Sequence, residues 1–90
     1  MKLLDAVSTN GDGATTERLR EIYTYTLACT GTFDGATVTT ELYVNGEWVA
    51  LDDATFTSAG VVKLEGGYYN VRGSVSGAGG STSVTLALVG

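Results

Sequence analysis

The sequence predicts an all-β protein with the architecture of a small antiparallel β-sandwich, Ig-like or jelly-roll-like. Short runs rich in Thr, Val, Tyr and Leu alternate apolar and polar residues with the period of two that half-buried strands show. Glycine-containing turns separate these runs roughly every ten residues, a spacing typical of sandwiches and small barrels. The chain has 90 residues, which is the size of one domain, and it contains no proline. This length has room for roughly seven or eight short strands.

The clearest element is a hairpin centred on Asn45-Gly46. Residues 36–44 alternate between an apolar-rich face and a face that carries Thr, Glu and Tyr side chains, and residues 47–51 follow the turn. Asn-Gly supplies the positive φ values of a type I′ turn, so the two-residue loop is expected to place Val44 beside Glu47. Trp48, the next residue, is expected to anchor the core beside this turn.

Further strands are predicted along the rest of the chain. They cover residues 23–29, 54–57, 61–65, 68–75 and 84–88. The glycine-rich stretch 77–80 is interpreted as the hairpin loop before the last strand. In each strand, alternate apolar residues are expected to face the core. The expected core consists of Tyr25, Leu27, Val38, Leu42, Val44, Trp48, Phe56, Val62, Leu64, Val71, Val75, Val84, Leu86 and Leu88.

The beginning of the chain differs from the rest. We predict an N-terminal arm or edge segment over residues 1–20, followed by the β-sandwich domain over residues 21–90. Leu3, Leu4 and Val7 form a short apolar patch, which a glycine-containing turn separates from the main strand pattern. Two interpretations of this patch stay open. It either docks on another protein or forms the sandwich's own first edge strand.

The sequence offers no arrangement suited to catalysis. Histidine, the side chain used most often as a general acid or base near neutral pH, is absent. Asp52 and Asp53 are adjacent, so on a strand they would point to opposite faces rather than converge on a substrate. Residues 10–13 resemble a calcium loop but lack the downstream bidentate glutamate, so a flexible turn is expected there. We predict a protein that is not an enzyme and binds neither a metal nor a cofactor.

Charge and hydropathy argue against other classes of partner. The net charge of −5 disfavours nucleic-acid binding, which depends on Lys and Arg neutralising phosphates. No stretch approaches the ~20 apolar residues of a membrane-spanning helix, so no membrane partner is expected. Cys29 is the only cysteine, which excludes an intramolecular disulfide. Its position in an alternating run predicts a small, buried, unreactive side chain.

Tyr68-Tyr69 is the place where an aromatic side chain is most expected at the surface. Adjacent residues of a strand face opposite sides of the sheet, so one ring should be buried and the other exposed. An exposed tyrosine combines a large apolar ring with a polar hydroxyl, and both sugars and proteins are bound by such side chains. Tyr68 is therefore a candidate contact residue.

Several runs of residues, taken in order, resemble those of small virion-associated proteins of tailed bacteriophages. The runs are residues 3–8, 30–33, 35–42, 45–49, 67–72 and 84–89. The charged stretch 15–21 departs from the glycine-rich linker expected of that family. The resemblance implies a capsid decoration (cement) or fibre-associated protein, built as a β-sandwich and carrying no catalytic residues.

The resemblance further implies a non-enzymatic structural protein on the outside of the virion, made in the host cytoplasm. Such a protein decorates and stabilises the capsid by binding the major capsid protein, copies of itself, or both, as a homo-oligomer or within a lattice. The candidate partner-binding residues are Leu3, Leu4, Val7 and Tyr68. The acidic charge fits this location, because packaged DNA inside the shell carries charge of the same sign.

Two other functions remain as alternatives. A tail- or fibre-associated module would bind a host-surface glycan or another virion protein, using an exposed aromatic side chain such as Tyr68 or Tyr43. A designed or bacterial Ig-like adhesion domain is the third interpretation. Copy number separates the first two, since decoration of a symmetric shell needs on the order of hundreds of copies per particle and a tail needs far fewer.

Overall fold

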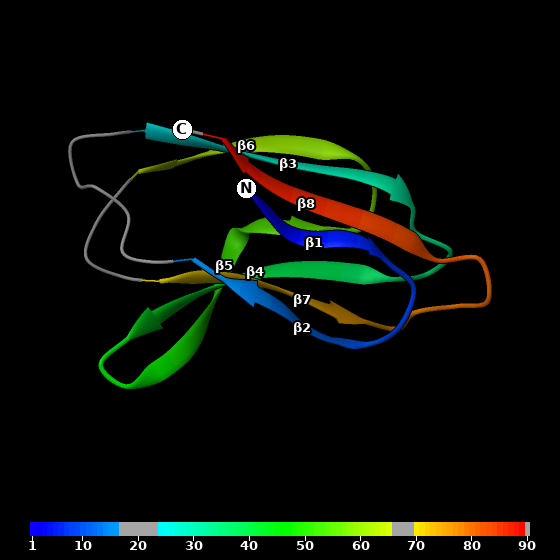
Figure 1. The fold of residues 1–90 in the computed structure, drawn as a ribbon, viewed down its shortest axis with the longest axis horizontal. Coiled ribbons are helices and arrows are strands. Elements are labelled where there is room, and N and C mark those ends of the chain that lie inside the picture. Colours follow the sequence, from blue (N-terminus) through cyan, green and yellow to red (C-terminus); the bar gives the residue numbers. More distant parts are fainter. Residues whose placement is uncertain (17–23, 66–69, 90) are drawn as a thin grey trace.

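The computed structural model describes residues 1–16, 24–65 and 70–89, apart from the side chain of Ala14, and its elements are all strands. The strands are β1 (Lys2–Val7), β2 (Gly11–Thr15), β3 (Thr24–Thr32), β4 (Thr37–Val44), β5 (Glu47–Phe56), β6 (Gly60–Glu65), β7 (Val71–Ser76) and β8 (Ser83–Val89). They form two four-stranded antiparallel sheets, in the orders β1-β8-β3-β6 and β2-β7-β4-β5. Figure 1 shows these sheets as two layers facing each other, which confirms the predicted sandwich.

The strand pairings follow a nested pattern. β1 pairs with β8, β2 with β7, β3 with β6, and β4 with β5, as in one long hairpin wrapped around the core. The contacts of β3 with β8 and of β4 with β7 then complete the two sheets. This nesting is the strand order of an eight-stranded jelly roll, and it distinguishes between the two sandwich types that the sequence left open.

The core lies between the two sheets, because alternate side chains of each strand point inward. Most of the predicted core residues are found there, and Tyr25, Leu42 and Val62 are partly buried against it. Val44 and Trp48 were expected in the core and lie outside it. The buried core consists of Leu3, Leu4, Leu27, Cys29, Ala36, Val38, Ala54, Phe56, Leu64, Val71, Val75, Val84, Leu86 and Leu88.

The N-terminal residues belong to the sandwich. β1 and β2 are edge strands, one in each sheet, so residues 2–15 do not form a separate arm. Leu3 and Leu4 are 1% and 2% exposed. Adjacent residues of a regular strand cannot both face the core, but the pairing of β1 with β8 has a register shift between Lys2 and Leu4. The edge-strand interpretation of the apolar patch is therefore the one that the structure supports.

The glycine at position 13 explains how β1 and β2 approach each other at the side of the sandwich. A side chain built on Gly13 would collide with the backbone oxygen of Leu3 and with the Leu4 side chain.

Residues 11–13 lie in β2, and the Asn10 carboxamide accepts a hydrogen bond from the Ala78 N–H at 2.9 Å. The flexible turn predicted for residues 10–13 is thus wrong, because the segment is paired with β7.

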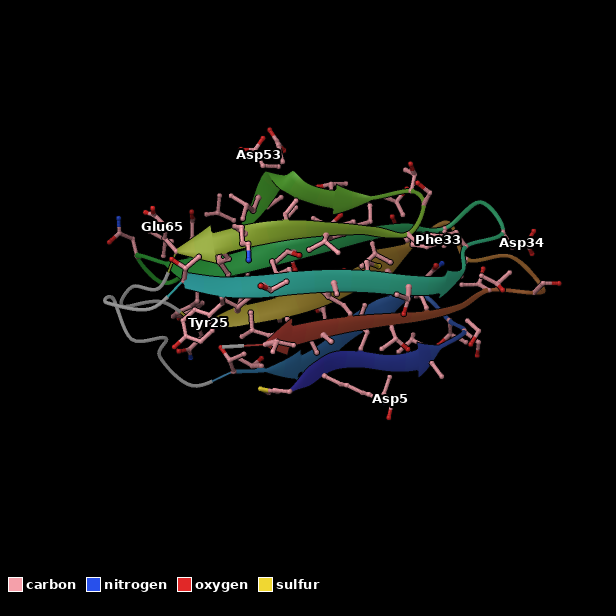
Figure 2. All side chains as sticks on the ribbon, turned by 90° about the horizontal axis from the view of Figure 1, so that it is seen from above. Asp5, Tyr25, Phe33, Asp34, Asp53 and Glu65 are labelled. Atoms are coloured by element: carbon pink, nitrogen blue, oxygen red, sulfur yellow. The ribbon has the colours of Figure 1, made fainter. Side chains whose placement is uncertain are left out.

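The glycine-rich stretch 77–80 is not a hairpin loop. It joins β7 to β8, and these strands belong to different sheets. The loop packs on Asp34, whose carboxylate accepts a hydrogen bond from the Ser81 N–H at 2.8 Å. Figure 2 shows Asp34 and Phe33 among the loops at one end of the sandwich. A hairpin at this position would require β7 and β8 to pair, and each is instead paired with other strands.

The two carboxylates at Asp52 and Asp53 lie in a bulge of β5. Thr39 pairs with Thr55 and the next residue, Thr40, pairs with Leu51, so residues 52–54 are displaced from the ladder. Ala54 turns into the core, while Asp52 and Asp53 are exposed. Figure 2 shows Asp53 at the outer edge of the molecule, where the strand bends. Both acids are solvent-exposed, and they lie in a bulge rather than in the regular ladder.

Candidate partner-binding surface

The end of the β4–β5 hairpin projects from the body of the sandwich, as the green ribbon in Figure 1 shows. Asn45 and Gly46 form its turn with φ values of 51° and 80°, and Val44 pairs with Glu47. Both features confirm the hairpin that the sequence predicts. The ladder between β4 and β7 reaches Leu42, and the Tyr43 N–H then donates a hydrogen bond to the Asn70 backbone oxygen at 2.9 Å. Beyond this point, the backbone ladder of the hairpin joins only its own two strands.

Apolar side chains are exposed on both faces of this hairpin. Val44 and Val49 share one face and are 40% and 49% exposed. Tyr43 is on the other face and is 42% exposed. In the same register, Tyr43 pairs directly with Trp48, so the two rings share a face. We define the hairpin tip as residues 43–49, and it carries half of the exposed large hydrophobic residues found in the described chain.

Trp48 lies on the outer face of its sheet, and this overturns its expected role as a core anchor. Val38 and Thr40 of β4 face the core, so Tyr43 and its partner Trp48 must face away from it. The two ring centroids are 5.1 Å apart with the planes tilted by 58°. This geometry is favourable for an aromatic pair, which stabilises the hairpin near its turn.

Arg72 of β7 connects the aromatic pair to two carboxylates. Its guanidinium carbon lies 4.2 Å from the centroid of a Trp48 ring, a cation–π contact. Its Nε donates to Glu41 Oε1 at 2.8 Å, and its Nη1 lies 3.3 Å from Asp12 Oδ2. Glu41 belongs to β4 and Asp12 to β2, so the outer face of one sheet brings these groups together from separate strands. We define the Arg72 cluster as Asp12, Glu41, Tyr43, Trp48 and Arg72.

The Arg72 cluster combines ion pairs with aromatic contacts on the outer face of its sheet. The guanidinium is matched by two carboxylates, and it covers one face of the indole ring. These contacts orient Trp48 and Arg72 against each other, and Tyr43 beside them is 42% exposed. Trp, Tyr and Arg are enriched among the residues that contribute most to binding at protein interfaces.

Three of the four residues proposed from the sequence as a partner-binding set lie in β1. Leu3 and Leu4 are buried in the chain's own core, and Val7 is partly buried against it. Leu3 and Leu4 are therefore inaccessible to a partner in this fold, which corrects the prediction for them. Tyr68 lies outside the described residues. The sequence did contain a signal for the exposed aromatic pair, because the predicted hairpin register already places Trp48 opposite Tyr43 on the Thr-rich face.

No reactive or metal-binding centre is found in the described residues. Cys29 is fully buried, and desolvation raises the pKa of its thiol from 9.0 to about 11. It stays protonated at neutral pH and is a poor nucleophile, as expected of a small core residue. The described parts of the chain contain no group of His, Cys, Asp or Glu side chains placed to hold a metal ion. They also contain no helix of the length and hydropathy that crossing a membrane requires.

Comparison with known proteins gives no match for this chain. No family model fits the sequence, and no curated protein or solved structure is significantly similar to it.

Proposed function

We propose that this protein is a non-enzymatic structural protein of a tailed-phage virion, which decorates and stabilises the outside of the capsid by binding the major capsid protein. The observation that carries the proposal is the hairpin tip, a projecting element with exposed apolar side chains on both faces. Exposed apolar surface that has no role in the core is typical of a docking element. Leu3 and Leu4, the residues first expected to dock, are replaced in this role by Tyr43, Val44 and Val49.

The size of the hairpin tip suits a contact that is weak in each copy and repeated many times. Complete burial of a Val or Tyr side chain stabilises a complex by about 1.5–3 kcal/mol before the entropic cost of association is subtracted. A few such side chains give modest affinity. On a symmetric shell, the contacts of many copies add through multivalency.

The overall charge supports a position outside the shell. The net charge of −5 would place the protein under repulsion from packaged DNA if it were inside. The jelly-roll strand order also occurs in viral capsid proteins and in lectins, which is a fold-level analogy and favours capsid binding and glycan binding alike.

Binding to capsids of the phage that encodes the protein tests the proposal. Val49→Lys places a charge in the hairpin tip at a position that is 49% exposed, and Val89→Lys is the matched control at a position that is 57% exposed on the other sheet. We expect Val49→Lys to reduce cosedimentation with the capsids and Val89→Lys to leave it unchanged. Circular dichroism checks that both variants are folded. Equal binding by wild type and Val49→Lys would contradict the proposed docking element.

Copy number provides the second measurement. Gel densitometry of purified particles is expected to give on the order of hundreds of copies, as decoration of a lattice requires. Only a few copies per particle would contradict capsid decoration and favour a tail or fibre location.

A glycan-binding module of a tail or fibre is the second candidate, and the Arg72 cluster favours it. An exposed tyrosine ring next to carboxylates and a guanidinium offers both stacking and hydrogen bonding to a sugar. In this case Tyr43→Ala should abolish binding to host-surface polysaccharide while Val49→Lys retains it. Isothermal titration of the two variants against that polysaccharide separates the glycan function from the capsid function.

A further inference from the structure

The four edge strands of the sandwich are not alike. Sheet edges present unpaired backbone N–H and C=O groups, and proteins commonly interrupt such edges with bulges that prevent pairing with other chains. β1 and β2 both have register shifts in their pairings, and β5 has the bulge at residues 52–54. β6 has no such interruption. Its six residues, 60–65, pair with β3 in one continuous register.

The outer-face side chains of β6 are Val61, Lys63 and Glu65, and all three are exposed. Val61 is 64% exposed and is the most exposed large hydrophobic residue of the described chain. Lys63 is the residue that would be expected to protect an edge by its charge. Its ammonium instead donates a hydrogen bond to Thr26 Oγ1 at 3.2 Å, and Thr26 lies on β3 directly opposite Lys63. The ammonium of Lys63 therefore lies over its own sheet, toward β3 and away from the edge.

We propose that β6 pairs with β6 of a second copy of this chain, antiparallel and about a two-fold axis. Such a pairing joins the two β1-β8-β3-β6 sheets into one continuous sheet and satisfies backbone groups along both edges. A two-fold axis perpendicular to the sheet reverses the strand direction, so identical strands meet in antiparallel orientation. It also keeps the inward-facing residues of both copies on the core side.

The side chains favour a register centred on Val62. In this register Val61 of one copy lies opposite Lys63 of the other, where the exposed valine covers the aliphatic part of the lysine. A register centred on Lys63 would place two lysines opposite each other, which is unfavourable. A register centred on Leu64 would pair fewer residues of β6. The two valines at position 62 would meet on the core side of the joined sheet.

Analytical ultracentrifugation of the purified chain over a range of concentrations tests the pairing. We expect a reversible dimer with a Kd of about 100 µM or tighter. Val61→Lys should weaken dimerisation about tenfold or more, because the new charge faces Lys63 of the second copy. Val89→Lys is the matched control, since Val89 is 57% exposed on the same outer face but belongs to β8, between β1 and β3. It should leave the Kd unchanged.

Hydrogen exchange gives a second measurement that does not depend on a variant. Amides of β6 should become more protected as the wild-type concentration rises through the Kd, while those of the β1 edge should not. A wild-type chain that stays monomeric at about millimolar concentration overturns the proposal. So does a Val61→Lys variant that dimerises as wild type does. Equal weakening by both valine variants also overturns it, because this result indicates contact through the sheet face rather than through the edge.

Discussion

The guanidinium of Arg72 lies over the indole ring of Trp48, with its central carbon 4.2 Å from the ring centroid. This contact connects β7 to the hairpin tip, which extends past the ladder between β4 and β7. Isolated two-stranded hairpins are only marginally stable in water. The Arg72 contact, the Tyr43 ring and the backbone bond from Tyr43 to Asn70 therefore hold the projecting element in place.

Replacement of Trp48 should be tolerated better than replacement of a core residue. Trp48→Ala removes an aromatic pair and a cation–π contact at a partly exposed site, so we expect it to lower the free energy of unfolding by about 1–2 kcal/mol. Leu27→Ala, at a position with no exposed surface, should lower it by about 2–5 kcal/mol. Urea denaturation of both variants measures the difference. A larger loss for Trp48→Ala than for Leu27→Ala would place Trp48 in the core after all.

The buried hydroxyl of Thr40 is a point of weakness in the core. Thr40 has no exposed surface, and its Oγ1 has no hydrogen-bond partner among the described residues. Thr40→Val keeps the shape and removes the unpaired hydroxyl, so we expect stability to rise by about 1 kcal/mol. Thr82 supplies the contrast, because its Oγ1 donates to the Phe33 backbone oxygen at 2.7 Å and accepts from the Gly79 N–H at 2.9 Å.

Thr82→Val should therefore destabilise the protein by about 1–3 kcal/mol, since it leaves those two backbone groups without their partner. Thermal melts of the two Val variants measure the opposite signs directly. If Thr40→Val lowered the melting temperature as Thr82→Val does, the Thr40 hydroxyl would have to be hydrogen-bonded in solution.

Two neighbouring glycines of the β7–β8 connection should respond differently to alanine. A Cβ on Gly79 would lie 2.5 Å from Asp34 Oδ2 and 2.6 Å from the Asp34 backbone oxygen, whereas a Cβ on Gly80 would meet nothing within 4 Å. Gly79→Ala must displace the loop and should cost about 1–3 kcal/mol. Gly80→Ala should change stability by less than about 0.5 kcal/mol. Chemical denaturation of both variants tests the packing of this loop on Asp34, and equal stabilities would exclude it.

Cys29 should make stability fall at alkaline pH. Its thiol has a pKa of about 11 in the folded chain against an ordinary value of 9.0, so the folded state holds the proton more tightly. Below about pH 9 both states are protonated and the contribution is fully present. Between about pH 9 and 11 the unfolded chain ionises while the folded chain does not, so unfolding becomes more favourable as the pH rises.

Cys29→Ala removes this dependence and leaves the titration of Tyr and Lys side chains in place. The difference in urea midpoint between wild type and Cys29→Ala should therefore change over this pH interval and be constant below it. A difference that does not vary with pH would show that burial leaves the thiol pKa unchanged.

The candidate surface could be predicted only partly from the sequence, because two expectations about the position of Trp48 conflicted. The alternation of β4 assigns Tyr43 to the outer face, and the hairpin register assigns Trp48 to the same face. The tendency of tryptophan to anchor a core leads to the opposite expectation, and that expectation is wrong for Trp48. The Arg72 contacts could not be predicted, because Asp12, Glu41 and Arg72 lie on three strands that are distant in sequence.

Local sequence patterns predict the elements that depend on neighbouring residues. Period-two alternation marks strands because side chains of a strand alternate between faces, and Asn45-Gly46 defines its turn and register because both residues accept positive φ. The position of each strand in the sandwich depends instead on long-range pairing. Leu3 and Leu4 are in the core because β1 pairs with β8 with an irregular register, and residues 77–80 cross between sheets because β7 and β8 take other partners. Such pairings join residues from opposite ends of the chain, and no local pattern encodes them.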